Sequence, residues 1–378
     1  MGNTPMPAIT LKPKEERRII RGHLWVYRNE IASLPTLQDG DVVDVFASNR
    51  RFVGRGFYQQ EGGIAVRILS EHQKIIDQTF FHEKLMQARA LREKLFPGSN
   101  VYRWVYGESD LLPGLVIDRY NTVAVMQSDC VFYERHAEKL TKELLKVEGI
   151  TSVWARFPGT KTWIGEKAEN IIVTLDGVQV QIDFEDTQKT GLFLDQRSNW
   201  PVIRKYAKDA SVLDGYCYHG LWSLHAGLAG AVSVLGVDTS SAAIEHARQN
   251  AARNELENCT FEQADIEEKL KQGNTYEVIV LDPPAFAKHR AQTRKALARY
   301  ESINTRAIKA LTPNGILISC SCSHFVSPEE FLEMLKRAAR KSGRQAQLLE
   351  MRGAAPDHPV LLAMPETAYL KYTVLQVF

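Results

Sequence analysis

Four short apolar runs, separated by segments of helical periodicity, most limit what the chain can fold into. They all follow Phe184 and read "ASVLDGY", "VSVLGVD", "YEVIVLDPP" and "GILISCSCS". Continuous apolar runs that alternate with helices indicate parallel strands that are covered on both faces. We therefore predict an α/β fold class, with a Rossmann-like, doubly wound domain over residues 181–378.

The first 180 residues carry different patterns. Residues 40–70 alternate apolar with polar residues and contain several glycines, which predicts short antiparallel strands. A small β-barrel or sandwich is therefore expected over residues 1–72. Residues 73–180 combine an amphipathic segment, "QTFFHEKLMQARALREKLF", with further strand and helix patterns, so we expect a middle α+β domain there.

Composition limits the compartment and the partners. The formal net charge is only +2, so any contact with nucleic acid must rely on a local basic surface. The odd number of five cysteines favours a reducing compartment. The start of the chain lacks a signal-peptide pattern, and its most apolar window, "GLWSLHAGLAGAVSVLGV", is typical of a buried helix followed by a buried strand. We predict a cytoplasmic protein that does not enter the membrane.

Acidic residues stand at the carboxyl ends of the first three apolar runs: Asp214, Asp238 and Asp282. Ligands of such sheets bind beyond these strand ends, so the acids should surround one crevice. Asp238 is placed to accept both hydroxyls of a ribose, and Asp265, in "FEQAD", could bind an adenine amino group. Each aspartate alone could instead cap a helix. A nicotinamide dinucleotide would also require an acid after the second strand.

Glycines after the first run form only a loose turn. Asp214 and Gly215, with Gly220 further on, do not make a true dinucleotide fingerprint, so this signal is weak by itself. We nevertheless predict that all three border the cofactor, as does Asp282.

The sequence "LDPPAF" follows the third run and is costly as ordinary structure, because proline fixes φ and supplies no backbone donor. A rigid turn can hold Asp282 against a flat base while Phe286 stacks on it. We therefore predict that Pro283, Pro284 and Phe286 bind substrate. A hydride-transferring oxidoreductase does not require this turn.

Seven motifs, spread over essentially the whole chain, match one known family. They read "RGHLWVYRNEI", "GESDLLPGLVIDRY", "KTGLFLDQRSN", "GVDTSSAAIEHARQNAARNEL", "LDPPAF", "SCS" and "DHPV…PETAYLK". Through them the chain resembles the PUA-domain-containing cytosine-5 methyltransferases of large-subunit (23S) ribosomal RNA, the methyltransferase I type.

The resemblance implies S-adenosylmethionine as cofactor, large-subunit ribosomal RNA as partner and a PUA-like RNA-binding domain. It also implies that Phe193 and Gln196 border the cofactor. One departure concerns "YCYHGLWS", where His219 and Leu221 replace the small residues that the family carries beside the methionine part of the cofactor.

Two of the five cysteines, Cys320 and Cys322, close the last apolar run. Carbon 5 of cytosine is a poor nucleophile, but thiolate attack on carbon 6 makes it an enamine-like carbon that can accept a methyl group. We expect the strand to end near Ser321, so that Cys322 projects into the crevice while Cys320 stays packed. The family's Ser-Cys-Ser also aligns with Cys322, which we predict to be the nucleophile, with Asp282 as its catalytic partner on the cytosine edge.

Other interpretations of these cysteines are weaker. A buried structural role is the usual state of a free cysteine. A zinc site is disfavoured because the C-x-C pattern lacks a second pair of ligands, so we predict no metal. His324 could act as a neighbouring cation on the thiol. No residue is identified as the base that removes the proton from carbon 5.

An RNA-contacting surface is predicted before the first strands, where arginines interleave with aromatic residues in "KEERRIIRGHLWVYRNEI". Arg21 could pair with phosphate and Trp25 could stack on a base. A solvated helix end with its aromatic residues in the core fits this stretch equally well. The sequence leaves a homodimer open.

Three other functions remain at this stage. An amino-group methyltransferase would also use an Asp-Pro-Pro-x-aromatic turn, but it would need no cysteine. A non-catalytic RNA-binding or assembly protein would follow if the altered turn no longer bound the cofactor. A nicotinamide oxidoreductase fits the pattern least well.

Overall fold

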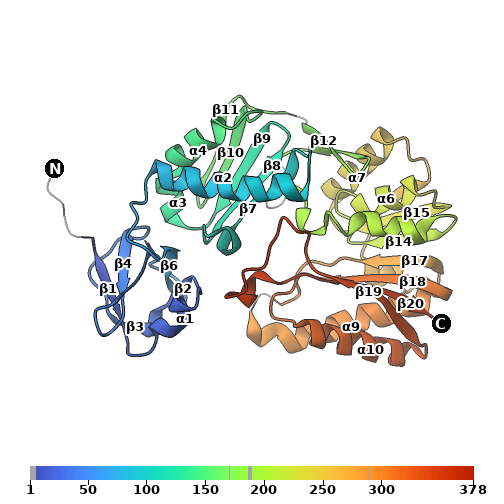
Figure 1. Cartoon of the computed structure of the whole chain (residues 1–378). Helices are drawn as coiled ribbons and strands as arrows, with labels where there is room; N and C mark the ends of the chain where they lie inside the picture. Colours follow the sequence, from blue (N-terminus) through green and yellow to red (C-terminus); the bar gives the residue numbers. More distant parts are fainter. Residues whose placement is uncertain (1–5, 170, 186–189, 288) are drawn as a thin grey trace. The chain divides into compact units, whose positions relative to one another are not determined.

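The computed structural model describes residues 6–169, 171–185, 190–287 and 289–378 (Figure 1). The chain forms two compact units. One unit comprises Met1–Ile171, Asp183–Gly191 and Asp357–Thr367, and the other comprises Ile172–Ile182, Leu192–Pro356 and Ala368–Phe378. The chain therefore passes between the two units more than once.

The first unit begins with a six-stranded sheet in the order β2-β6-β5-β4-β1-β3. Strands β1 and β4 pair in parallel, and the other neighbours are antiparallel. Gly56 lets β5 and β6 approach closely, because a Cβ there would clash with the carbonyl group of Arg67. The elements are β1 (Ala8–Leu11), α1 (Glu16–Ile20), β2 (Trp25–Tyr27), η1 (Arg28–Glu30), β3 (Ile31–Ser33), β4 (Val42–Phe46), β5 (Phe52–Tyr58) and β6 (Ile64–Ser70).

The middle part of this unit is a five-stranded sheet in the order β11-β10-β9-β8-β7. Strands β9 and β10 are parallel, because helices α3 and α4 carry the chain back between them. Asp77 starts α2 by accepting the backbone N–H of Phe80 at 3.0 Å. The elements are α2 (Gln78–Leu95), β7 (Val101–Tyr106), η2 (Gly107–Asp110), β8 (Leu115–Tyr120), β9 (Val123–Ser128), α3 (Val131–Arg135), α4 (Ala137–Leu145), β10 (Ser152–Phe157) and β11 (Thr160–Gly165).

The segment Asp357–Thr367 also belongs to the first unit, although it lies close to the end of the chain. The buried Arg92 donates to the carbonyl oxygen of Asp357 at 2.7 Å, and the carboxylate of Asp357 accepts the backbone N–H of Arg103 at 2.8 Å. Tyr106 donates its hydroxyl to the carbonyl oxygen of Thr367 at 2.9 Å. These buried polar contacts explain why the segment packs with the first unit although it lies in the C-terminal half of the sequence.

The second unit contains a seven-stranded sheet in the order β16-β15-β14-β17-β18-β20-β19. The strands from β16 to β18 are parallel, as predicted, and β20 runs antiparallel between β18 and β19. The strands are β14 (Ser211–Gly215), β15 (Ser233–Asp238), β16 (Cys259–Gln263), β17 (Tyr276–Leu281), β18 (Leu311–Ser321), β19 (Ala346–Arg352) and β20 (Lys371–Val377).

Helices cover both faces of this sheet. In Figure 1, α6 and α7 lie on one side and α9 and α10 on the other, as the doubly wound prediction requires. The helical elements are η3 (Leu194–Gln196), η4 (Trp200–Ile203), α5 (Arg204–Ala207), α6 (Leu221–Leu228), α7 (Ser241–Arg253), α8 (Ile266–Lys269), η5 (Arg290–Gln292), α9 (Thr293–Ala310) and α10 (Pro328–Ser342), and η6 (Pro365–Thr367) belongs to the first unit. Within the described ranges, no helix is long and apolar enough to cross a membrane.

A hairpin of β12 (Ile171–Leu175) and β13 (Val178–Ile182) extends the second unit on the N-terminal side. Its backbone is held by α7, because Asn254 and Asn250 accept the N–H groups of Gln179 and Gln181 at 2.8 and 2.9 Å. The boundary expected between residues 180 and 181 falls inside β13, so the compact units divide the chain differently from the three predicted ranges.

Candidate active site

The predicted acids gather at the carboxyl edge of the seven-stranded sheet. Asp214 is the penultimate residue of β14, Asp238 ends β15 and Asp282 follows β17 directly. Strand β14 lies between β15 and β17, so the chain reverses its direction of winding there. In doubly wound sheets such a switch point opens the ligand crevice.

Asp214 is fully buried and stabilises the first turn of α6. One of its oxygens accepts the N–H and the hydroxyl of Ser223, at 3.1 and 2.7 Å. The other oxygen has no hydrogen-bond partner among the described residues. Burial raises the pKa of Asp214 to about 7, and the charge of Asp282 adds to this rise. Its assignment to the cofactor site stays a prediction, and the contact shown is with the chain itself.

The turn between β14 and α6 has an unusual backbone. Tyr216 and Tyr218 have φ angles of +63° and +48°, and Gly220 has +82°. Non-glycine residues with positive φ are uncommon and cost about 1–3 kcal/mol each. The ring of His219 stacks on that of Tyr218 with centroids 3.8 Å apart, and burial lowers the pKa of His219 to about 3. His219 and Leu221 are only 2% and 6% exposed, and their position beside the cofactor stays a prediction.

Packing explains the two glycines of this turn. A Cβ on Gly215 would lie 2.7 Å from the side chain of Ile266, and one on Gly220 would lie 3.0 Å from the ring of Phe261. The close approach is therefore to side chains of the chain itself. Whether the same glycines also border a ligand stays a prediction.

Asp238 connects two turns at the crevice. Its oxygens accept the backbone N–H of Tyr218 at 3.1 Å and that of Ser240 at 2.9 Å. Asp265 is exposed and caps α8 through the N–H of Glu267 at 2.7 Å. The helix-cap interpretation therefore holds for Asp265 in this structure, and its contact with adenine stays a prediction.

Asp282 is the centre of a small polar network. The amide of Gln196 donates to both of its carboxylate oxygens at 3.1 Å, and the indole N–H of Trp222 donates at 3.1 Å. Burial raises the pKa of Asp282 to about 6, against the lowering effect of these hydrogen bonds. Phe193, on the same segment as Gln196, contacts the ring of Tyr218 edge-on at 5.1 Å. Gln196 and Phe193, which are expected to border the cofactor, thus contact Asp282 and Tyr218, respectively.

The turn after Asp282 is partly packed into the chain. Pro283 is buried and Pro284 is exposed. The ring of Phe286 lies 4.6 Å from that of Tyr300, and the guanidinium of Arg299 lies 4.2 Å from its centre. The ring of Phe286 therefore contacts two side chains of the protein itself. Its stacking on a base stays a prediction.

The two cysteines differ in exposure as expected. Strand β18 ends at Ser321, Cys320 is fully buried, and Cys322 is partly exposed. The thiol of Cys322 donates to the carbonyl oxygen of Pro283 at 3.7 Å. This contact joins the "SCS" loop directly to the "DPP" turn. The described residues contain no group of three or more potential ligands around these cysteines that could hold a metal.

Comparisons with family models and with individual relatives agree. The model of a PUA-like domain matches residues 9–71, and that of a methyltransferase domain matches residues 207–358. The ribosomal RNA large subunit methyltransferase I of Shewanella denitrificans is 36% identical, and the match covers 98% of this chain and 99% of the relative. The chain belongs to the ribosomal RNA large subunit methyltransferase I family. The member from Tolumonas auensis is 34% identical, with 97% and 98% coverage.

Solved structures agree with this family fold. A SAM-dependent methyltransferase from Streptococcus mutans has a TM-score of 0.86 at 18% identity, covering 98% of this chain and all of the other. Another, solved as a complex with SAH, reaches 0.88 at 19% identity with the same coverage. The predicted family and the predicted fold class, a PUA-like domain followed by a Rossmann-like methyltransferase domain, are confirmed.

Sequence reasoning missed three members of the site. Trp222 donates to Asp282, Tyr300 shares a hydrogen bond of 2.9 Å with the hydroxyl of Ser323, and Lys371 donates to the carbonyl oxygen of Ser323 at 2.6 Å. Lys371 ends the "PETAYLK" motif, which was the one available signal. Trp222 and Tyr300 lie within apolar helical patterns that are typical of core residues.

The predicted RNA-contacting residues lie in the first unit. Arg21 is exposed, whereas Trp25 is partly buried and donates its indole N–H to Glu108 at 2.8 Å. Arg67 lies 5.6 Å from the Trp25 ring and also pairs with Glu108. Trp25 also lines a small cavity of about 160 Å³ with Tyr106, Gly107, Glu108, Gly114, Val116, Glu366 and Thr367. Trp25 is therefore at least partly structural.

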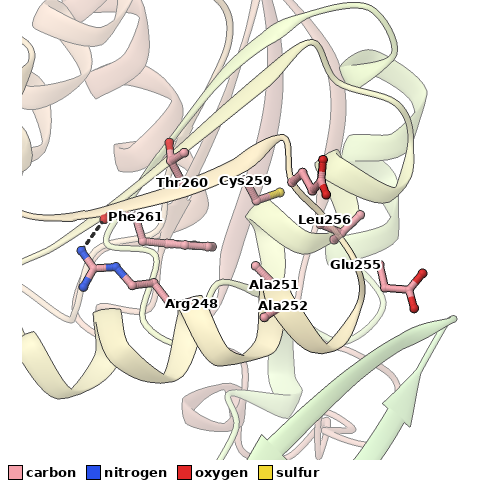
Figure 2. Close-up of a pocket in the computed structure, with 9 residues that line it drawn as sticks. Arg248, Ala251, Ala252, Glu255, Leu256, Cys259, Thr260 and Phe261 are labelled. Atoms are coloured by element: carbon pink, nitrogen blue, oxygen red, sulfur yellow. Dashed lines mark hydrogen bonds between the residues drawn. The ribbon is translucent and has the colours of Figure 1, made fainter.

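The larger cavity of the second unit, about 720 Å³, lies between α7 and the edge strand β16 (Figure 2). Its lining includes Arg248, Leu256, Cys259 and Phe261, and none of the predicted site residues. Figure 2 shows Arg248 reaching the carbonyl oxygen of Phe261, at 2.8 Å. This hydrogen bond engages a carbonyl group on the open edge of the sheet, so that group is less available to pair with another strand.

Proposed function

We propose that this methyltransferase transfers a methyl group from S-adenosylmethionine to carbon 5 of a cytosine in large-subunit ribosomal RNA. The contact between Cys322 and Pro283 carries the proposal, because it places a partly exposed thiol against the turn that presents Asp282. Cytosine-5 chemistry needs a soft nucleophile and an acidic group on the same base, and these two loops supply both.

The residues at the strand ends suit the cofactor. Asp238 would accept the ribose hydroxyls, Asp265 would reach the adenine amino group, and Phe193 would border the ligand. When it is ionised, the buried Asp214 would add negative potential for a positively charged sulfonium, and one of its oxygens has no hydrogen-bond partner among the described residues. When bound, S-adenosylmethionine supplies the electrophilic methyl group.

In the proposed reaction, the Cys322 thiolate attacks carbon 6 and forms a carbon–sulfur bond. The displaced electron pair moves toward carbon 5, and Asp282 hydrogen-bonds the ring nitrogen that gains charge. A pKa of about 6 allows this carboxyl group to be partly protonated near neutral pH, so that it can donate to that nitrogen. After carbon 5 has been methylated, loss of its proton expels the thiolate. Water or another group must take that proton.

A covalent trap tests the proposal. With 5-fluorocytosine in the target RNA, the wild type should form a stable adduct at Cys322, because fluorine blocks the final loss of the proton. Mass spectrometry of the tryptic peptides would locate the adduct. The Cys322→Ala variant should lose methylation while retaining the fold and cofactor binding, whereas the matched control Cys320→Ala should retain most activity.

The outcomes separate the alternatives. An adduct on Cys320 would reassign the nucleophile. If the wild type forms no adduct and the Cys322→Ala variant remains active, the cytosine-5 mechanism is rejected and methylation of an exocyclic amino group is favoured. Mass spectrometry of ribosomal RNA from a deletion strain would then identify the modified nucleotide.

A further inference from the structure

Lys371 is a buried cation for which the proposed reaction, as derived above, has no role. It is the first residue of β20 and is only 3% exposed. Because β20 is antiparallel to β18, Lys371 pairs in register with Ser321, directly before Cys322. The topology therefore places an ammonium beside the "SCS" loop.

The ammonium group is fixed by two carbonyl oxygens. It donates to those of Ser323 and Tyr369, both at 2.6 Å. The hydrogen bonds of the ammonium group to described residues thus use two of its three N–H donors. Burial of an ammonium group is unfavourable unless its charge is compensated, and no carboxylate of the described residues forms a hydrogen bond with this group.

Two acidic groups of the described residues act on the charge of Lys371. Burial lowers the pKa of Lys371 to about 8, while negative charge at Cys322 and at Glu330 acts to raise it. Glu330 is already engaged in the capping box of α10, where it accepts the N–H of Ser327 at 2.8 Å. Burial raises the pKa of Tyr300, which keeps this neighbour of the loop neutral.

The neighbouring acid groups cannot stabilise a thiolate at Cys322, because each of them is either neutral or negatively charged. Burial raises the pKa of Cys320 and of Asp282, which favours their neutral forms, and the resting thiol of Cys322 donates to the carbonyl oxygen of Pro283. A carbonyl oxygen facing the sulfur disfavours its anion. A compensating cation is needed if Cys322 is to ionise near neutral pH.

We propose that Lys371 is a positioning residue that holds the "SCS" loop and stabilises Cys322 as a thiolate, an inference that rests on the proposed role of Cys322. The thiol releases its proton to solvent, its contact with Pro283 is broken, and the ammonium remains protonated beside the sulfur anion. The same cation stabilises the thiolate again when the carbon–sulfur bond breaks.

The test measures the thiol directly and does not depend on methylation. The full-length protein is alkylated with iodoacetamide from pH 5.5 to 9.5, and mass spectrometry follows the peptide that contains Cys322. We expect an apparent pKa for Cys322 below the value of about 8.5 for a free cysteine. A wild-type value at or above that figure overturns the inference by itself.

Variants then assign the effect to the charge. Lys371→Met should raise the apparent pKa of Cys322 by about one unit or more. Each unit should slow alkylation at pH 7 roughly threefold, because the lower thiolate content is partly offset by the higher nucleophilicity of the thiolate. Lys371→Arg should largely retain the wild-type profile. Lys84→Met, which removes another partly buried lysine in the first unit, should leave the profile unchanged.

Controls separate a structural role from the proposed one. If Lys371→Met does not fold, Lys371→Gln keeps hydrogen-bond donors without the charge and should show the same rise. Methylation kinetics should show a lower kcat with unchanged KM for RNA. An unchanged alkylation profile in a folded Lys371→Met protein rejects this inference alone. An active Cys322→Ala variant rejects the proposed function instead, while the alkylation profile still reports on Lys371.

Discussion

Asp214 lies at the end of β14 with its side chain fully buried, and one of its oxygens holds the start of α6 through Ser223. At residue scale this contact stabilises the turn of the crevice but requires the burial of a carboxyl group. Its pKa of about 7 in the folded protein compares with about 3.9 in an unfolded chain. The folded state therefore binds this proton more tightly than the unfolded state does.

The sign of this difference gives a pH prediction. The contribution of Asp214 to stability is complete below about pH 4 and is lost as the pH rises through 7. Asp214→Asn keeps an oxygen for Ser223 but cannot ionise. The difference in free energy of unfolding, variant minus wild type, should therefore increase by about 2–3 kcal/mol from pH 5 to pH 8. Urea unfolding at the two pH values measures this. An equal difference at both values would show that Asp214 is not protonated on folding.

Asp238 carries the second prediction at this scale. Asp238→Ala should weaken S-adenosylmethionine binding by roughly 1.5–3 kcal/mol, the scale of a charged hydrogen bond, measured by calorimetric titration. Because Asp238 also holds the N–H groups of Tyr218 and Ser240, part of the loss would come from the turn. Asp238→Asn keeps one acceptor oxygen, so it can preserve one of these two backbone contacts and serves as a partial control for the turn. Unchanged affinity in both variants would remove Asp238 from the site.

At the scale of elements, helix α1 and its C-cap carry exposed basic side chains. Arg17 and Arg21 are exposed, whereas Arg18 is used internally, bonded to Glu30 at 2.7 Å. Deleting residues before Ser70 would be a poor test of RNA binding, because Phe57 stacks on Phe132 at 4.4 Å in the core of the middle part. Surface substitutions are therefore the cleaner experiment.

The double variant Arg17→Ala/Arg21→Ala should bind RNA more weakly. Each phosphate contact contributes roughly 0.7–0.9 to the slope of log affinity against log salt concentration. If both arginines contact phosphates, the magnitude of this slope should therefore fall by about 1.4–1.8. Titrations at several salt concentrations measure this slope, and cofactor binding should not change. A matched control is Arg89→Ala, on the surface of α2. An unchanged slope would show that α1 is only structural.

At the scale of the whole molecule, the two units share the chain in an interleaved way. The methyltransferase unit takes the β12–β13 hairpin from before residue 183 and gives up the segment Asp357–Thr367. A fragment cut at residue 181 would lose β12 and split β13. Its α7 would also lose the bond between Asn254 and Gln179.

We therefore expect residues 172–378 to be more stable than residues 181–378. Loss of the buried strand side chains and of the backbone contacts to α7 should cost at least about 2 kcal/mol. Urea unfolding of both fragments, with S-adenosylmethionine titration to show that the site is intact, makes the comparison. Equal stability would show that the hairpin does not belong to this folding unit.

Much of the fold and the identity of several site residues were predictable from local patterns. The apolar runs place β14, β15, β17 and β18, because a buried parallel strand must be apolar on both faces. Asp214, Asp238 and Asp282 followed from their position after those runs. The end of β18 at Ser321 likewise predicted which cysteine would be partly exposed.

Only the tertiary structure decided what those residues contact. The sequence does not show that Trp222 and Gln196 meet at Asp282, or that Lys371 returns to the loop of Cys322, because these pairs are far apart in the chain. The expectation that Phe286 and His219 lie beside ligands stays a prediction. Only the structure shows that Phe286 packs with Tyr300 and Arg299 and that His219 is buried against Tyr218. Local periodicity determines which elements form, and packing between distant segments determines which side chains remain available for chemistry.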